Sequence, residues 1–141
     1  MSLITGIARQ LYQKVITTKN FGQCMKNVQL LSAGDGKCKA QFTVAEEHLN
    51  IGGTLHGGFI STVVDCVSSY ALATHGTGTF RVSTSVDLHI MFVKTAFPGD
   101  IVTVDAKTIR SGKKIAFLAV ELRKNDSKDV IAHGQHTKYL L

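Results

Sequence analysis

Apolar residues recur with two different periods along the chain, and these periods predict its helices and strands. The first set begins at Leu3 and Ile4 and continues with Ile7, Leu11 and Val15, at the spacing of one helix face. A longer helix is predicted over residues 57–74, where one half of the helical wheel is apolar: Phe59, Ile60, Val63, Val64, Val67, Tyr70 and Ala71. Gly76 and Gly78 follow as signals for its end.

Most of the remaining chain has the two-residue period of strands. Val28 and Leu30 precede the alternating stretch 38–44, and Gly34-Asp35-Gly36-Lys37 between them predicts a tight hairpin turn. Residues 80–93 alternate, with Val82, Thr84, Val86, Leu88, Ile90 and Phe92 expected on one face and Arg81, Ser83, Ser85, Asp87 and His89 on the other. Further strands are predicted at 101–110, 114–124 and 130–139, joined by turn-forming residues.

Only one helix lies between predicted strands, which excludes a repeated β-α-β architecture because its parallel crossovers need several helices. An antiparallel sheet wrapped around the helix of residues 57–74 remains. We therefore predict an α+β fold with an N-terminal helix, a long central helix and a six-stranded antiparallel sheet. The 141 residues fit one domain, 1–141, that can bury a proper core.

The composition and charge of the chain indicate which classes of ligand or partner it could bind. A formal net charge of +6 suits an anionic ligand, but the sequence has no Trp and no recognisable nucleic-acid motif. Nucleic acid is therefore a poor candidate, and a small phosphorylated ligand fits at least as well. No apolar run approaches the roughly 18 to 20 residues of a membrane span. Cys24, Cys38 and Cys66 have no paired spacing, which favours reduced thiols inside the cell and a small buried apolar role for each.

One face of the predicted central helix is unusual because it is polar but almost uncharged. Asp65 is the only residue with a formal charge between Glu47 and Arg81, and its neighbours on the wheel are small or apolar: Ser61, Thr62, Ser68, Ser69 and Leu72. An ordinary solvated helix face is rich in Lys, Glu and Arg. We therefore expect this face to contact another surface, most simply a second copy of the chain.

The start of this helix is a candidate site for a carbonyl oxygen. A helix N-terminus presents unpaired N–H groups and a partial positive charge, and Gly57 and Gly58 have no side chain to keep a ligand away. Such donors stabilise the negative charge that develops on a carbonyl oxygen during nucleophilic attack. Glycine pairs before helices are also common turn residues, so this alternative stays open.

Asp65 is the candidate general base because a carboxylate on a charge-poor face can accept a proton from water. Its alternative role is that of a satisfied carboxylate in an interface. A Ser-His-Asp triad built from Ser83 or Ser85, His56 and Asp65 is a weaker candidate, since no G-x-S-x-G motif is present.

The remaining reactive residue types give weaker signals. Cys66 follows Asp65 directly but has no His placed by local sequence to activate it. His133 and His136 lie three residues apart in a predicted strand, so they are expected on opposite faces and not as a metal pair. His48, His75 and His89 are interpreted as surface or packing residues.

Several motifs, taken in order, resemble the hotdog-fold acyl-coenzyme A thioesterases over essentially the whole chain. These are Glu46-Glu47-His48 leading to Asn50, then Gly53-Thr54-Leu55-His56-Gly57-Gly58, Val64-Asp65, Ser85-Val86-Asp87 and His136-Thr137-Lys138. The resemblance implies a long helix wrapped by an antiparallel sheet. It also implies a homodimer with active sites at the interface, and commonly a homotetramer of two dimers.

The resemblance also implies roles for individual residues. The Gly57 N–H and Asn50 would polarise the thioester carbonyl, while Asp65 from the facing subunit activates water. Ser85 would hold that water, with Ser83 on the same face as the alternative. His56 would orient Asn50 and its loop. No metal or bound cofactor is implied, since coenzyme A is part of the substrate.

By the same resemblance, three segments would line the path of coenzyme A. Their residues are Phe92, Val93, Lys94, Thr95, Ala96 and Phe97, then Arg110, Ser111, Gly112, Lys113, Lys114 and Ile115, and finally Tyr139. Lys94, Arg110, Lys113 and Lys114 would supply positive charge for its phosphates. For any single lysine, solvation of a turn is the competing explanation.

The function predicted in this way is hydrolysis of fatty acyl-coenzyme A to free fatty acid and coenzyme A. Two alternatives remain, a hotdog-fold hydratase or dehydratase of acyl-coenzyme A and a noncatalytic acyl-coenzyme A-binding module. The acid-free N-terminus resembles a weak mitochondrial presequence, and a plain amphipathic helix is the alternative. We therefore expect a cytoplasmic or mitochondrial protein, or one found in both compartments.

Overall fold

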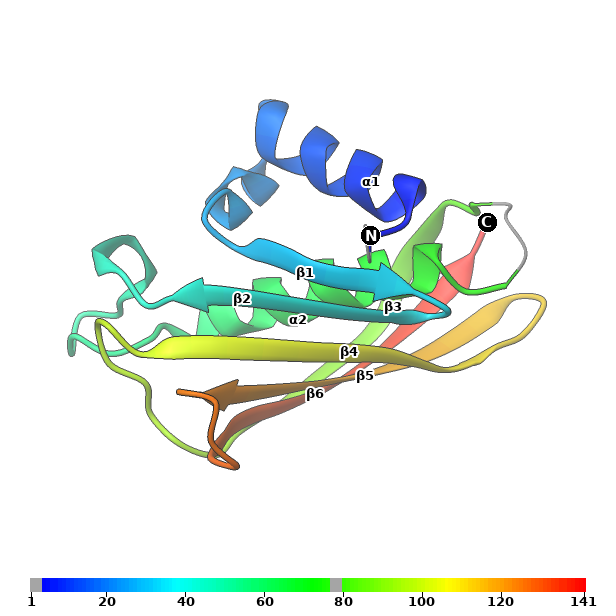
Figure 1. Ribbon diagram of the computed structural model, residues 1–141. Coiled ribbons are helices and arrows are strands. Elements are labelled where there is room, and N and C mark those ends of the chain that lie inside the picture. Colours follow the sequence, from blue (N-terminus) through cyan, green and yellow to red (C-terminus); the bar gives the residue numbers. More distant parts are fainter. Residues whose placement is uncertain (1–3, 77–79) are drawn as a thin grey trace.

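A curved antiparallel sheet wraps around one long helix, α2, in the computed structural model, which describes residues 4–76 and 80–141 (Figure 1). The helices are α1 (Gly6–Thr17) and α2 (Gly57–Ala73), with short 3-10 turns at Phe21–Met25 and Glu46–His48. The strands are β1 (Gln29–Gly34), β2 (Lys37–Thr43), β3 (Ser83–Phe92), β4 (Ile101–Ser111), β5 (Ile115–Lys124) and β6 (Val130–Leu140). The predicted fold class is confirmed. Leu3 and Gly78 lie outside the described residues.

The sheet has the order β1-β2-β4-β5-β6-β3, and every neighbouring pair is antiparallel. The β1–β2 turn contains Asp35 and Gly36 with φ angles of 53° and 77°, as expected for a tight Asp-Gly hairpin turn. Strand β3 lies at one edge of the sheet, and its bounds and the faces of its residues differ most from those predicted from the sequence. It begins at Ser83 rather than near residue 80.

The single alternation predicted through residues 80–93 is wrong because β3 contains a bulge. The register with β6 shifts between Ser85 and Asp87. Before the shift, Ser83 lines a pocket and Ser85 bonds to the buried His136. After it, Ile90 packs beside Val64, and Phe92 covers Gly57. A bulge adds one residue to a strand, so Ile90 and Phe92 point to the same side of the sheet as the two serines.

The seven apolar residues predicted on the core face of α2 are all buried, and they pack against β2, β4, β5 and β6. Ser68 is a correction, because it is fully buried rather than on the same open face as Asp65. Its hydroxyl is satisfied by the backbone oxygen of Asp65 at 3.1 Å and by the Nδ1 atom of His136 at 2.8 Å. These bonds explain how a serine is accommodated in this interior.

Helix α1 packs against the second half of α2. The Tyr12 and Tyr70 rings meet edge to face at 6.1 Å, and the Tyr12 hydroxyl donates to the backbone oxygen of Val28. Together with the start of β3, the two helices enclose the pocket described below. In the described part of the chain, no helix is long and apolar enough to cross a membrane.

Candidate active site

The start of α2 presents one unbonded backbone donor. His56 is the N-cap residue, and its Nδ1 atom accepts the Gly58 N–H at 2.7 Å. Among the described residues, no hydrogen-bond partner is found for the Gly57 N–H. A Cβ at Gly57 would lie 3.2 Å from the Phe92 ring, so only glycine leaves this approach open. The Gly57 donor thus remains for a ligand oxygen, while His56 uses the neighbouring one.

Asn50 lies in the loop that leads to α2 and is held by that loop. Its Oδ1 atom accepts from the Gly52 N–H at 2.9 Å and the Thr54 N–H at 3.1 Å, and its Nδ2 atom donates to the Thr54 hydroxyl. The implied role of His56 in orienting Asn50 stays a prediction. In the described structure, the His56 ring bonds to Gly58, while its backbone N–H bonds to the His48 oxygen at 2.8 Å.

A second polar cluster lies halfway along α2, beneath β3. His136 is 1% exposed and joins two serines, with Nδ1 at 2.8 Å from Ser68 Oγ and Nε2 at 2.7 Å from Ser85 Oγ. The half-exposed Asp65 carboxylate lies 3.8 Å from Nε2. Burial lowers the pKa of His136 and outweighs the opposing effect of Asp65, so the ring is neutral near pH 7. The Ser85 hydroxyl and the Asp65 carboxylate thus both lie near the Nε2 atom of this ring.

Lys138 completes this cluster from the same face of β6. Its Nζ atom donates to Ser69 Oγ at 2.7 Å, and the residue is only 7% exposed. Burial lowers the pKa of the Lys138 ammonium, while the charge of Asp65 acts in the opposite direction. The Lys138 ammonium also lines the pocket beside Asp65, where it is a hydrogen-bond donor.

Sequence reasoning missed this buried cluster. It named His136 only in a motif and in a rejected metal pair, named Lys138 only in the motif, and placed Ser68 on the wrong face. Residues 136 and 138 are two apart in a strand whose other inward positions are apolar, and this is the signal that could have identified them. The pairing of β6 with β3 is long range, so sequence spacing alone could not place them beside Ser85.

The two halves of the predicted site do not meet within one chain. Gly57 and Asp65 lie eight residues apart on α2, which corresponds to about 12 Å along the helix axis. A thioester bound at the Gly57 N–H is therefore out of reach of the Asp65 in the same chain. Asn50, His56 and Phe92 belong to the first half, and Ser85 and His136 belong to the second.

The predicted coenzyme A residues also fall into two groups. Phe92 ends β3, and residues 93–97 follow it near the start of α2, where the backbone oxygen of the buried Ala96 accepts a hydrogen bond from the Leu55 N–H. Arg110–Ile115 comprise the end of β4, the β4–β5 turn and the start of β5, beside the last residues of β6, where the Lys114 Nζ atom lies 5.6 Å from the centre of the Tyr139 ring. Lys94 is paired with Asp129 at 2.8 Å, so its ammonium has a partner within the chain.

The described residues contain no group of three or more His, Cys, Asp or Glu side chains that could hold a metal ion. Cys66 is half-buried, and burial raises the pKa of its thiol to about 12. Cys38 is buried, and its thiol pKa is also raised to about 12. Neither thiol is activated as a nucleophile, because the reactive form is the thiolate.

Comparisons with known proteins give the family of the chain. Residues 52–131 match the family profile described as the thioesterase superfamily. Acyl-coenzyme A thioesterase 13 of Homo sapiens is 35% identical over 140 residues, which cover 99% of each chain. A putative esterase of Schizosaccharomyces pombe is 31% identical and covers 97% of this chain and 84% of its own.

Solved structures give the same assignment. Thioesterase superfamily member 2 of zebrafish is 34% identical with a TM-score of 0.89, covering 99% of this chain and 100% of its own. The Mus musculus protein of the same name is 32% identical with a TM-score of 0.83, covering 96% and 98%. The chain therefore belongs to the thioesterase superfamily of thioester hydrolases and has its hotdog fold.

Proposed function

We propose that this chain hydrolyses fatty acyl-coenzyme A to free fatty acid and coenzyme A, at sites shared between two copies of the chain. One observation carries the proposal. The Gly57 N–H at the start of α2 and the Asp65–Ser85 pair halfway along it are both accessible, yet they lie too far apart to act on one thioester within a chain. Two relatives that are 35% identical to this chain are named acyl-coenzyme A thioesterase 13, and these names support the substrate class.

Strand β3 offers the surface through which two copies would join. It is the last strand of the sheet order, so one of its edges has no neighbour in the chain. Val86, Met91 and Phe92 are each more than half exposed, which is unusual for apolar side chains on one strand. Antiparallel pairing of two β3 edges about a two-fold axis would satisfy the backbone and cover these side chains.

The same two-fold pairing would complete the site. An axis near the middle of β3 sets the Ser83 end of one copy beside the Phe92 end of the other. Because Phe92 covers Gly57, the helix start of one copy would then face Asp65 and Ser85 of its partner. The two groups of coenzyme A residues would come together in the same way. Pairing of such dimers into a tetramer remains a part of the proposal that rests on resemblance alone.

The chemistry needs few groups. The thioester oxygen accepts a hydrogen bond from the Gly57 N–H, and a free N–H of the Asn50 amide can add a second one. Asp65 takes a proton from a water molecule held by Ser85, and the oxygen of that water bonds to the carbonyl carbon. The C–S bond then breaks, and the leaving thiolate takes up a proton from solvent, while Asp65 releases the proton that it accepted and becomes a carboxylate again. A thiol has a pKa near 8.5, so a dedicated acid is not required.

No metal or bound cofactor enters this proposal, because the amide donors and one carboxylate supply the required steps. Coenzyme A would bind with its phosphates near the exposed cations of the β4–β5 turn, Arg110, Lys113 and Lys114. The cytoplasm and the mitochondrion both remain proposed locations.

Mixed dimers test whether the site is shared. Asp65→Asn removes the base from one half of a site, and Asn50→Ala weakens the other half. Each variant alone should lose about 100-fold or more in kcat. If the two variants are expressed together, half of the randomly formed dimers carry one intact site, and about a quarter of the wild-type rate should return. Thiol release from acyl-coenzyme A is the measurement.

Two controls sharpen the result. Each variant mixed with itself should stay inactive, and separately folded variants should regain activity only as they exchange subunits. A mixed preparation no more active than its parents would contradict the shared site. Turnover of enoyl- but not saturated acyl-coenzyme A would instead indicate a hydratase, and tight binding without any turnover would indicate a noncatalytic binding module.

A further inference from the structure

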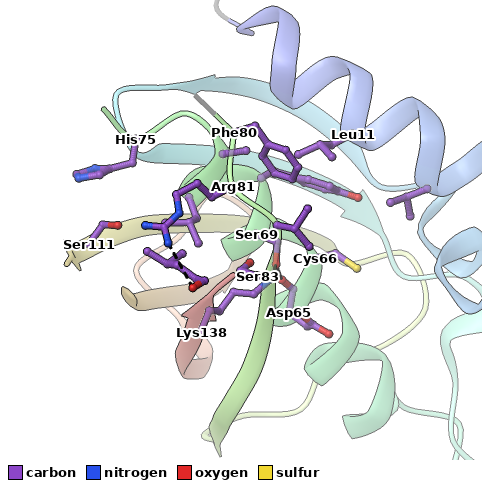
Figure 2. Close-up of a pocket in the computed structure, with 16 residues that line it drawn as sticks. Leu11, Asp65, Cys66, Ser69, His75, Phe80, Arg81, Ser83, Ser111 and Lys138 are labelled. Carbon is purple, nitrogen blue, oxygen red and sulfur yellow. Dashed lines mark hydrogen bonds between the residues drawn. The ribbon is translucent and has the colours of Figure 1, made fainter. Parts of the chain in front are cut away.

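A pocket of about 340 Å³ opens beside Asp65, between α1, the second half of α2 and the start of β3 (Figure 2). One wall is apolar, with Leu11 and Val15 of α1 and Phe80 ahead of β3. Its volume is within the usual range of small-molecule sites, which are mostly apolar with a few polar groups in fixed positions. Asp65, the proposed general base, lines one side of the pocket. From there the pocket extends toward the end of α2, away from Gly57.

The polar groups of this pocket are dominated by donors. Lys138 lines it although the residue is 93% buried, since only 7% of its surface is exposed. Its Nζ atom has three hydrogens, and Ser69 Oγ accepts one of them at 2.7 Å. Among the described residues, no carboxylate lies within 4 Å of this nitrogen. Burying an ammonium with incomplete hydrogen bonding is costly, so an acceptor from outside the chain would relieve that cost.

Three other groups extend this polar side. Ser83 and Ser111 line the pocket with their hydroxyls, and Arg81 lines it with a side chain fixed by the backbone oxygens of Lys113 and Leu140. Asp65 is the one carboxylate on the lining. The lining thus has two cationic side chains, Lys138 and Arg81, and one carboxylate, so its net charge is positive.

We propose that this pocket receives the acyl group of the substrate and selects acyl chains that carry an oxygen acceptor, a carboxylate or a hydroxyl, which Lys138 binds. This inference rests on the proposed function, because that function brings the thioester carbonyl to Asp65 at the mouth of the pocket. The apolar wall takes the methylene groups of the chain. A carboxylate at its end gains a charge-assisted hydrogen bond, which a plain hydrocarbon end does not.

Matched substrates test this selectivity. The substrates are acyl-coenzyme A compounds whose acyl groups have four, six or eight carbons. At each length, one compound ends in a methyl group, one in a hydroxymethyl group and one in a carboxylate. For at least one length, we expect kcat/KM of the wild type to favour an oxygen-ended chain over the methyl-ended one by about 10- to 100-fold. Lys138→Met should remove this preference, and Lys39→Met on the outer face of the sheet should keep it.

The ratio between substrates separates recognition from a general effect of the lysine on catalysis. If Lys138→Met lowers the rate for every substrate by the same factor, Lys138 acts through Asp65 and the proposal is wrong. It is also wrong if the wild type favours the methyl-ended chain at every length. Arg81→Gln provides a second variant at an exposed position, in case Lys138→Met does not fold, and it should reduce the preference for carboxylate.

Inert thioethers keep this test independent of hydrolysis. Coenzyme A alkylated on sulfur with a hexyl or a 5-carboxypentyl group has no thioester to cleave, and its Kd is measured by calorimetry. A lower Kd for the carboxypentyl compound that is lost in Lys138→Met would support the pocket even if no acyl-coenzyme A were hydrolysed. Equal Kd values for the two thioethers in the wild type would overturn the inference while leaving the proposed function untouched.

Discussion

Ser85 and His136 form the shortest contact between a hydroxyl and a ring nitrogen in the proposed site, at 2.7 Å. The neutral ring has two tautomers. With the proton on Nδ1, Ser68 accepts it and Ser85 donates to Nε2; with the proton on Nε2, Ser85 accepts and its own hydrogen is free for water or Asp65. In either case His136 fixes the Ser85 hydroxyl, and this contact is why the proposed mechanism uses Ser85 rather than Ser83 to hold the water.

The size of the Ser85→Ala effect distinguishes two mechanisms. If Ser85 only holds the water, its removal should lower kcat by about 10- to 100-fold, and no acyl-enzyme should accumulate. If Ser85 were a nucleophile activated by His136, the loss would be about 10,000-fold or more. Rapid-mixing kinetics and mass spectrometry of the enzyme during turnover provide the measurement.

Ser32→Ala on β1 is the matched control, since it removes a hydroxyl from a distant strand of the same sheet. Its kcat should stay within about twofold of the wild type. An acyl group found on Ser85 would overturn the water-holding role.

At the scale of the element, the start of α2 depends on the absence of a side chain at residue 57. In Gly57→Ala the new Cβ would lie 3.2 Å from the Phe92 ring and would crowd the oxygen that approaches the N–H. We expect kcat/KM for acyl-coenzyme A to fall about 10-fold or more. Gly6→Ala is the control, because Gly6 begins α1 and a Cβ there has open space around it.

Circular dichroism should show unchanged helix content in both variants. If Gly57→Ala keeps the wild-type kcat/KM, the thioester oxygen does not need to approach the N–H of this residue closely.

The elements show which parts of the fold the sequence could predict. Local signals predicted the β1–β2 turn at Asp35 and Gly36 and the buried face of α2, because turn geometry and helical period are set by neighbours in the sequence. The bulge after Ser85 has no such local signal, so the single face predicted for β3 was wrong. Burial of Ser68 depends on His136, which is 68 residues away, and no spacing rule can find that partner.

At the scale of the molecule, two buried histidines connect stability to pH. His48 is 2% exposed and stacks on the Phe59 ring at 4.3 Å, and His136 lies beneath β3. Burial lowers the pKa of both rings below their ordinary value of 6.5, although Glu47 opposes this for His48, as Asp65 and Asp87 do for His136. Both are neutral in the folded chain near pH 7.

In acid, the unfolded chain therefore binds more protons than the folded one. The stabilising contribution of each neutral ring is complete above about pH 6.5 and is lost as the pH falls below this value toward the lowered pKa. The free energy of unfolding should decrease by up to about 1.4 kcal/mol per pH unit for each histidine. Urea titrations at fixed protein concentration, between pH 7.5 and pH 5, measure this slope.

Replacing either ring should remove its share of the slope. His48→Gln and His136→Gln each eliminate one group that gains a proton on unfolding, so the double variant should lose most of the dependence between pH 6.5 and pH 5. The exposed His75 provides the control, and His75→Gln should keep the wild-type slope. A double variant whose stability still falls as steeply as the wild type would assign the acid sensitivity to carboxylates instead.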